Sequence, residues 1–207
     1  LPSNYYKRRA TIKKISVQQE LLFIKGEKPK SRIVSIDKDY LRPIVRGKEI
    51  KKVEFGAKVN KLQIDGINFI QRISFDNFNE GTQFKNTIYK AQGLTKTKVR
   101  IVGADAIYAT NKNRVFATSK KIQTDFKPKG QPSKHRKQQL QLARIITKER
   151  ATRLEGSFGK EKEHYHLKKI KAKTKKTEIL WIFFGIHTAN CLEIGRRMQK
   201  QSLEKVA

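Results

Sequence analysis

Two acidic residues stand apart from other acids in a basic chain. Asp105 follows an apolar run and precedes a basic one in VRIVGADAIYATNKNR, and Glu155 lies in RLEGSFGKEKEHY. Carboxylate oxygens are ligands that Mg²⁺ prefers. Two such ions about 4 Å apart can activate the attacking oxygen of a phosphodiester reaction and stabilise the leaving one. The two acids are therefore candidates for a metal site that acts on phosphodiesters.

Each acid also has an ordinary structural interpretation. An aspartate after a strand commonly caps the next turn, which would explain Asp105. A helical glutamate usually pairs with a cation three or four residues away, but around Glu155 these positions hold only uncharged residues: Ala151, Thr152, Phe158 and Gly159. Glu155 would then be a surface charge without a partner in a regular helix.

The charge of the chain points to a polyanionic partner. Its 207 residues include 48 Lys and Arg against 18 Asp and Glu, a formal net charge of +30. Such an excess repels itself in a compact state unless a polyanion such as nucleic acid neutralises it. No clear basic amphipathic helix or lipid-anchor motif indicates a membrane partner. A single cysteine, Cys191, fits a reducing, cytoplasmic compartment and is expected in the core.

The first half of the chain predicts one helix followed by short strands. The helix is expected in TIKKISVQQELLFI, ending before Gly26. The pair Asp65-Gly66 predicts a type I′ hairpin within LQIDGINFIQRISF, because both central positions of that turn need positive φ. Three further strands are expected in RIVSI, PIVR and VEFGAKVN.

The second half alternates helices and strands. Helices are expected in NEGTQFKNTIYKAQGL, with Gly93 as its stop, in the long run from residue 139 to 170, and in TEILWIFFGIHTANCLEIGRRMQ. Strands are expected in KVRIVGADAIY and KIQTDF, and a loop in KPKGQPSKHRKQQ. The aromatic residues of the last helix (Trp181, Phe183, Phe184) are expected in the core. The fold class is therefore α/β, a mixed sheet covered by helices.

The ordered motifs resemble the C-terminal part of bacterial insertion-sequence transposases of the DDE class. The resemblance runs from Arg32 to about Asn190 and is carried by RIVSIDKDYLRPIVRGKEIKKVEFGAKVN, IDGINFIQRISFDNFNEG, VGADAIYATNKNR and RLEGSFGKEKEHYHL. It implies an RNase H-like sheet with flanking helices, in which three carboxylates bind two Mg²⁺ or Mn²⁺ ions for DNA cleavage and strand transfer. It further implies a nucleoid-associated protein that acts as a homo-oligomer in a transposition complex.

The resemblance assigns roles to individual residues. Asp105 corresponds to the second aspartate of the family, Glu155 to its glutamate, and Lys162 to a lysine that contacts DNA. Lys148 and Ala151 stand where relatives carry a tyrosine and an arginine, so Arg150 and Arg153 are the candidate substitutes. We also expect phosphate contacts from the run KKIKAKTKK, which begins with Lys168 and Lys169.

The first aspartate of the family is not found by this reading. Asp37 and Asp39 lie in a turn, Asp65 is explained by its hairpin, and Asp76 by capping of the next helix. His164 and His166 point to different faces of a helix and are not expected to share a metal.

We therefore expect residues 1–30 to be a basic remnant of a preceding helical region, and residues 31–207 a partial, N-terminally truncated catalytic domain without its first central strand. The alternatives are a non-catalytic nucleic-acid-binding remnant and, with less support, a basic RNA-binding protein such as a ribosomal component.

Overall fold

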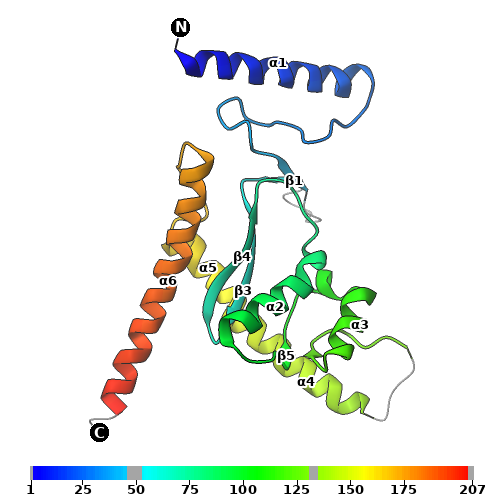
Figure 1. The fold of residues 1–207 in the computed structure, drawn as a ribbon, viewed down its shortest axis with the longest axis vertical. Helices are drawn as coiled ribbons and strands as arrows, with labels where there is room; N and C mark the ends of the chain where they lie inside the picture. Colours follow the sequence, from blue (N-terminus) through cyan, green and yellow to red (C-terminus); the bar gives the residue numbers. More distant parts are fainter. Residues whose placement is uncertain (1, 46–52, 131–134, 205–207) are drawn as a thin grey trace. The chain divides into compact units, whose positions relative to one another are not determined.

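The computed structural model describes residues 2–45, 53–130 and 135–204 (Figure 1). The chain divides into two compact units. The first comprises residues 1–59, 72–78 and 171–180, and the second comprises residues 60–71, 79–170 and 181–207. Each unit is described by itself.

The first unit begins with α1 (Ser3–Ile24), which contains the predicted N-terminal helix. Two short strands, β1 (Pro43–Val45) and β2 (Val53–Phe55), pair antiparallel. The predicted strand RIVSI is wrong. The backbone N–H of Ile33 donates to the side chain of Gln18 on α1 (2.9 Å), so this segment is tied to a helix and not to a neighbouring strand.

A buried glutamate organises the first unit. Glu178, at 3% exposure, accepts hydrogen bonds from Lys38 Nζ (3.1 Å) and Tyr40 Oη (2.8 Å). Burial, followed by the contact with Glu178, raises the pKa of Tyr40 above its ordinary value, so the phenol stays a donor. Asp76 forms an ion pair with Arg42 (3.7 Å), so the prediction that it caps a helix is wrong.

A hairpin joins β3 (Lys58–Ile64) to β4 (Ile67–Ser74), and its turn belongs to the second unit. Asp65 and Gly66 both have positive φ (46° and 76°), which confirms the predicted turn.

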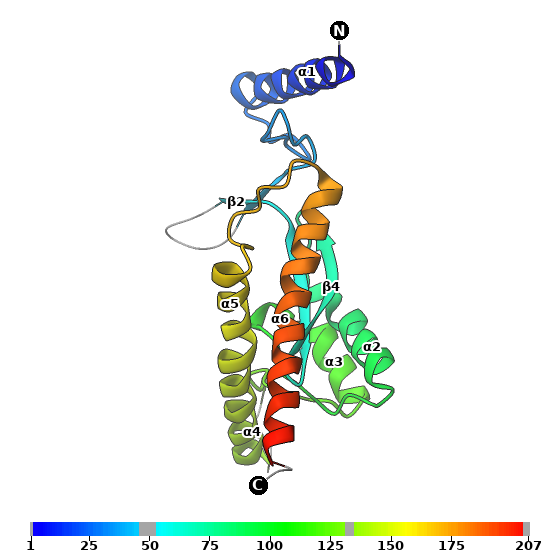
Figure 2. The same cartoon turned by 90° about the vertical axis from the view of Figure 1, so that its left-hand side faces the viewer.

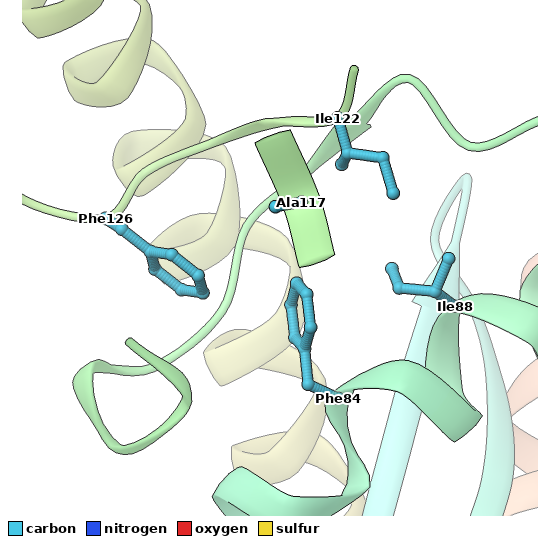
Figure 3. Packing of buried hydrophobic residues seen from close by; sticks show 5 residues of the cluster. All are labelled: Phe84, Ile88, Ala117, Ile122 and Phe126. Carbon is cyan, nitrogen blue, oxygen red and sulfur yellow. The ribbon is translucent and has the colours of Figure 1, made fainter. Parts of the chain in front are cut away.

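The core of the second unit surrounds α2 (Phe84–Thr95). Before this helix lies the short helix η1 (Glu80–Gln83), capped by Asn79, and after it lie β5 (Ile101–Val102), η2 (Ala106–Tyr108), α3 (Asn111–Ser119) and β6 (Gln123–Thr124). Gly93 does not end α2, as predicted; the helix continues to Thr95, and Lys96 closes it in the left-handed conformation. Figure 3 shows the buried side chains Phe84, Ile88, Ala117, Ile122 and Phe126, with Phe84 in the middle of the group.

A long helix with one irregular turn follows. It consists of α4 (Arg136–Glu149), the π-helical turn η3 (Arg150–Glu155) and α5 (Gly156–His164), which form one continuous rod (Figure 2). Gly156 and Gly159 lie inside the rod and do not interrupt it.

The last helix is α6 (Lys175–Glu204), as predicted. Its side chains are more exposed than expected. Phe183 (45%), Phe184 (62%) and Cys191 are exposed, so their prediction as core residues is wrong. Among the described residues, no helix combines the length and the apolar character needed to cross a membrane.

The strands of the described residues form three two-stranded sheets: β1–β2, β3–β4 and the parallel pair β5–β6. The mixed α/β class is confirmed, but these residues do not build the single sheet that was expected. Since β5 and β6 have only two residues each, they offer hydrogen bonds to each other and not to the hairpin. The division at residue 30 and the RNase H-like topology stay predictions.

Candidate carboxylate site

Asp105 follows β5 and caps η2. Its Oδ1 accepts a hydrogen bond from the backbone N–H of Ala106 (2.6 Å), so the ordinary interpretation as a turn cap is correct. Its side chain nevertheless remains 69% exposed. Capping therefore fixes the direction of the carboxylate without removing it from solvent.

Glu155 ends the π-helical turn, and this turn supplies the partner that a regular helix would not. Arg150 Nη1 lies 3.6 Å from Glu155 Oε1, five residues away in the sequence. In a π-helix the hydrogen bonds run from i to i+5, so residues at this spacing become neighbours. The prediction that Glu155 has no helical partner was wrong because it assumed 3.6 residues per turn.

Arg150 joins the two predicted acids. The same Nη1 atom lies 4.0 Å from Asp105 Oδ1. Because both contacts end on one atom, the two carboxylate oxygens are no farther apart than these two distances together. The structure thus brings together the acids that were selected from sequence, although they are fifty residues apart.

Asp125 is a third carboxylate at this place, and sequence reasoning missed it. Its side chain is only 4% exposed; Oδ2 lies 3.6 Å from Arg150 Nε, and Oδ1 accepts the backbone N–H of Ala104 (3.0 Å). Asp125 directly follows β6, which runs parallel to β5. The carboxyl ends of neighbouring parallel strands meet at one edge, so its position after the predicted strand KIQTDF was the available signal.

The charge balance of the carboxylate site (Asp105, Asp125, Arg150 and Glu155) is negative. Three carboxylates face one guanidinium, and none of the contacts is shorter than 3.6 Å. Arg150 Nε is buried without a hydrogen-bond partner. Arg150 is therefore held here by charge and not by hydrogen bonds, in a negative region of a strongly basic chain.

A tyrosine lies beside this site. Tyr108 Oη donates to Asn60 Oδ1 (2.8 Å). Burial, followed by the negative charges of Glu80 and Asp105, raises the pKa of Tyr108 above its ordinary value.

A buried ion pair fastens the helix that carries Glu155. Lys61 Nζ on β3 donates to both carboxylate oxygens of Glu161 on α5 (2.9 and 2.8 Å) and to Ser157 Oγ (2.8 Å). The two charged side chains are 0% and 3% exposed. Burial lowers the pKa of Lys61 and raises the pKa of Glu161, while the hydrogen bonds between them oppose both shifts. Sequence reasoning did not find this pair, because its members are 100 residues apart.

The basic residues that were predicted to bind DNA have different surroundings. Arg153 pairs with Glu149 (2.9 Å) and Asp65 (3.7 Å), and Lys168 pairs with Glu163 (2.9 Å). Lys162 and Lys169 are exposed. The structure places Arg150 alone of the predicted set against the two acids.

The donor set limits what a metal could use. In the described ranges, no three His, Cys, Asp or Glu side chains are close enough to hold one ion. This agrees with the expectation that His164 and His166 do not share a metal. Asp105 and Glu155 offer a pair of exposed carboxylates.

Comparison with known proteins supports the resemblance for the segment that contains this site. Residues 102–188 match the family model described as "Transposase DDE domain". The matched segment includes Asp105, Asp125, Arg150 and Glu155. No curated protein and no solved structure matches the chain. The family match supports a DDE-type transposase, and with it a DNA partner.

Proposed function

We propose that this chain acts in DNA transposition and that Asp105 and Glu155 together hold a divalent cation, Mg²⁺ or Mn²⁺. The observation that carries the proposal is the approach of both carboxylates to one Arg150 nitrogen, within the segment that matches the transposase family. Phosphoryl transfer to DNA is the reaction class that this arrangement supports.

The two carboxylates fit one hard cation. Mg²⁺ is usually bound through one or two carboxylates, with water and substrate phosphates completing its shell. Asp105 and Glu155 remain 69% and 59% exposed, so water and a phosphate can reach them. A bound ion would polarise a phosphoryl oxygen and lower the pKa of an attacking water or hydroxyl.

The other members of the site have positioning roles in this proposal. Asp125 ties Ala104 to Arg150 and so orients the loop that presents Asp105. Arg150 neutralises the carboxylates before a cation binds. Since it makes no hydrogen bond through Nε, it can exchange a carboxylate for a DNA phosphate, a ligand that suits the planar guanidinium.

The basic surface supplies the affinity for DNA. We propose phosphate contacts for Lys162, Arg153, Lys168 and Lys169. Contacts of this kind carry no base information, and binding through them weakens steeply with salt.

A non-catalytic nucleic-acid-binding protein is the second candidate. The observation that favours it is Arg150, which already balances part of the charge of Asp105 and Glu155. In that case the acids hold the arginine in place, and the basic surface alone binds nucleic acid.

Titration of the full chain with Mn²⁺ separates the two candidates. Asp105→Asn and Glu155→Gln should each weaken Mn²⁺ binding about tenfold or more, since Mg²⁺-type sites depend on few carboxylates. Glu149→Gln is the matched control, because Glu149 is an exposed acid of the same rod and pairs with Arg153. Equal Mn²⁺ affinity in all four proteins would refute the metal site, and DNA binding that persists in EDTA would then support the second candidate.

A further inference from the structure

A polar cavity of about 460 Å³ lies in the second unit, apart from the carboxylate site. Neither Asp105 nor Glu155 lines it. Its walls come from the hairpin turn, from η3 and α5, and from α6, and its charged lining residues include Asp65, Arg153, Lys160, Glu193, Arg196 and Arg197. Its volume is within the range of sites that take small ligands or parts of larger ones.

The inner wall of the polar cavity is already satisfied. Glu161 is paired with Lys61, and Asn68 Nδ2 donates to Glu161 Oε1 (3.0 Å). Asn190 exchanges two hydrogen bonds with the backbone of Asn68 (2.9 and 2.7 Å). A ligand therefore meets few free polar groups on this wall, and recognition depends on the charged residues around it.

These charged residues leave a positive excess. Four lining cations face Asp65 and Glu193, since the third lining acid, Glu161, is balanced by Lys61. The excess is two charges. Lys160 has no ion pair among the residues that the structure describes, and Arg196 contacts only the carboxylate of Glu193 there (3.3 Å). The cavity is thus suited to an anion of charge close to −2.

One of the cations is held in place by the hairpin turn. Arg197 Nη1 donates to the Asp65 carboxylate (2.9 Å), and its Nη2 donates to the Asp65 carbonyl (2.6 Å). Gly66 has φ +76°, and a Cβ at this position would lie 2.7 Å from Arg197 Nη2. Glycine therefore serves both the turn and the close approach of the guanidinium. Arg153 Nη1 lies 3.7 Å from the same carboxylate, so Asp65 orients two arginines.

We propose that the polar cavity binds a phosphate group, which either the DNA backbone or a free nucleotide can supply. Arginine forks match phosphate oxygens in a planar, bidentate way, and Lys160 adds a compact positive charge. The DNA source rests on the proposed function, whereas the free nucleotide does not. Because the cavity does not involve Asp105 or Glu155, its binding does not require a divalent cation.

The test uses the full chain in EDTA and three probes: inorganic phosphate, a deoxynucleoside 5′-monophosphate and a short DNA duplex. The cavity variant is the double substitution Lys160→Ala and Arg196→Ala, in which both side chains are exposed and removal leaves the buried wall intact. The matched control is Lys120→Ala with Arg144→Ala, two exposed cations of the second unit outside the cavity. Circular dichroism verifies that both variants are folded.

The probes distinguish the sources of the phosphate. Binding of the monophosphate that falls about tenfold in the cavity variant, but not in the control, indicates a free nucleotide. For the DNA backbone, only the duplex binds, and the cavity variant lowers the salt slope by about one for each lost phosphate contact, more than the control does. Equal effects of the two variants on DNA, with no binding of either small anion, overturn the proposal. Failure of Mn²⁺ binding at Asp105 and Glu155 would leave this result unaffected, so the two proposals fail separately.

Discussion

Replacement of Glu161 by glutamine tests whether the buried ion pair stabilises the helix that carries Glu155. The substitution preserves the shape of the side chain and one acceptor for Lys61, but it removes the negative charge. Lys61 is 0% exposed, and its Nζ lies within 2.9 Å of both Glu161 oxygens. Removing one partner of such a pair leaves an uncompensated buried charge and costs about 3–5 kcal/mol.

Removing both charges should cost less. In the double variant Lys61→Met and Glu161→Leu no buried charge is left, and apolar replacement of buried pairs is often neutral. Asn68 Nδ2 and Ser157 Oγ then lose hydrogen-bond partners, which costs about 1–3 kcal/mol. The double variant should therefore be more stable than Glu161→Gln alone.

Urea unfolding, followed by circular dichroism, measures these differences from the midpoint at constant slope. Glu163→Gln is the control, because Glu163 is an exposed acid of the same helix, and its stability should be unchanged. A midpoint for Glu161→Gln equal to that of the control would contradict the reasoning. So would a double variant less stable than the two single variants together predict.

The pH dependence of Lys61→Met gives a second check. Burial already raises the pKa of Glu161, and loss of Lys61 should raise it further. A carboxyl whose folded pKa is raised adds stability below its unfolded pKa, about 4.3, and this stability is lost as the pH rises. Lys61→Met should therefore be closest to the wild type in acid and fall behind it toward neutral pH; an opposite trend in urea midpoints would reject the assignment.

Three further outcomes are expected. Phe84→Ala should destabilise the second unit by about 3–5 kcal/mol in urea unfolding, because Phe84 is 2% exposed in the middle of the core; a loss below 1 kcal/mol would contradict this packing. Gly81→Ala should lower the melting temperature, since a Cβ there would lie 2.5 Å from the carbonyl oxygen of Ile107, and an unchanged melting temperature would argue against this contact. With Mg²⁺, the chain alone should bind DNA without strand transfer, because two carboxylates hold one ion and two-metal chemistry needs a further ligand; cleavage that Asp105→Ala abolishes would show that another carboxylate completes the site.

Local features of this protein could be predicted from its sequence. The Asp65-Gly66 turn follows from the need for two positive φ values, and the helices at both ends follow from local composition. Asp105 and Glu155 were found because isolated acids are conspicuous in a chain of net charge +30. These are properties of short segments, in which the backbone preferences of neighbouring residues decide the outcome.

Only the tertiary structure decided how the sites are built. Asp125 and the Lys61–Glu161 pair depend on contacts between residues that are far apart in the sequence, and the Arg150–Glu155 contact depends on a π-helical turn that no residue pattern announced. The exposure of Phe183 and Phe184 shows the same limit, since their apolar character does not say which helix face the fold covers. Burial and ion pairing are decided by the surfaces that meet in the folded chain, and an individual segment does not specify its neighbours.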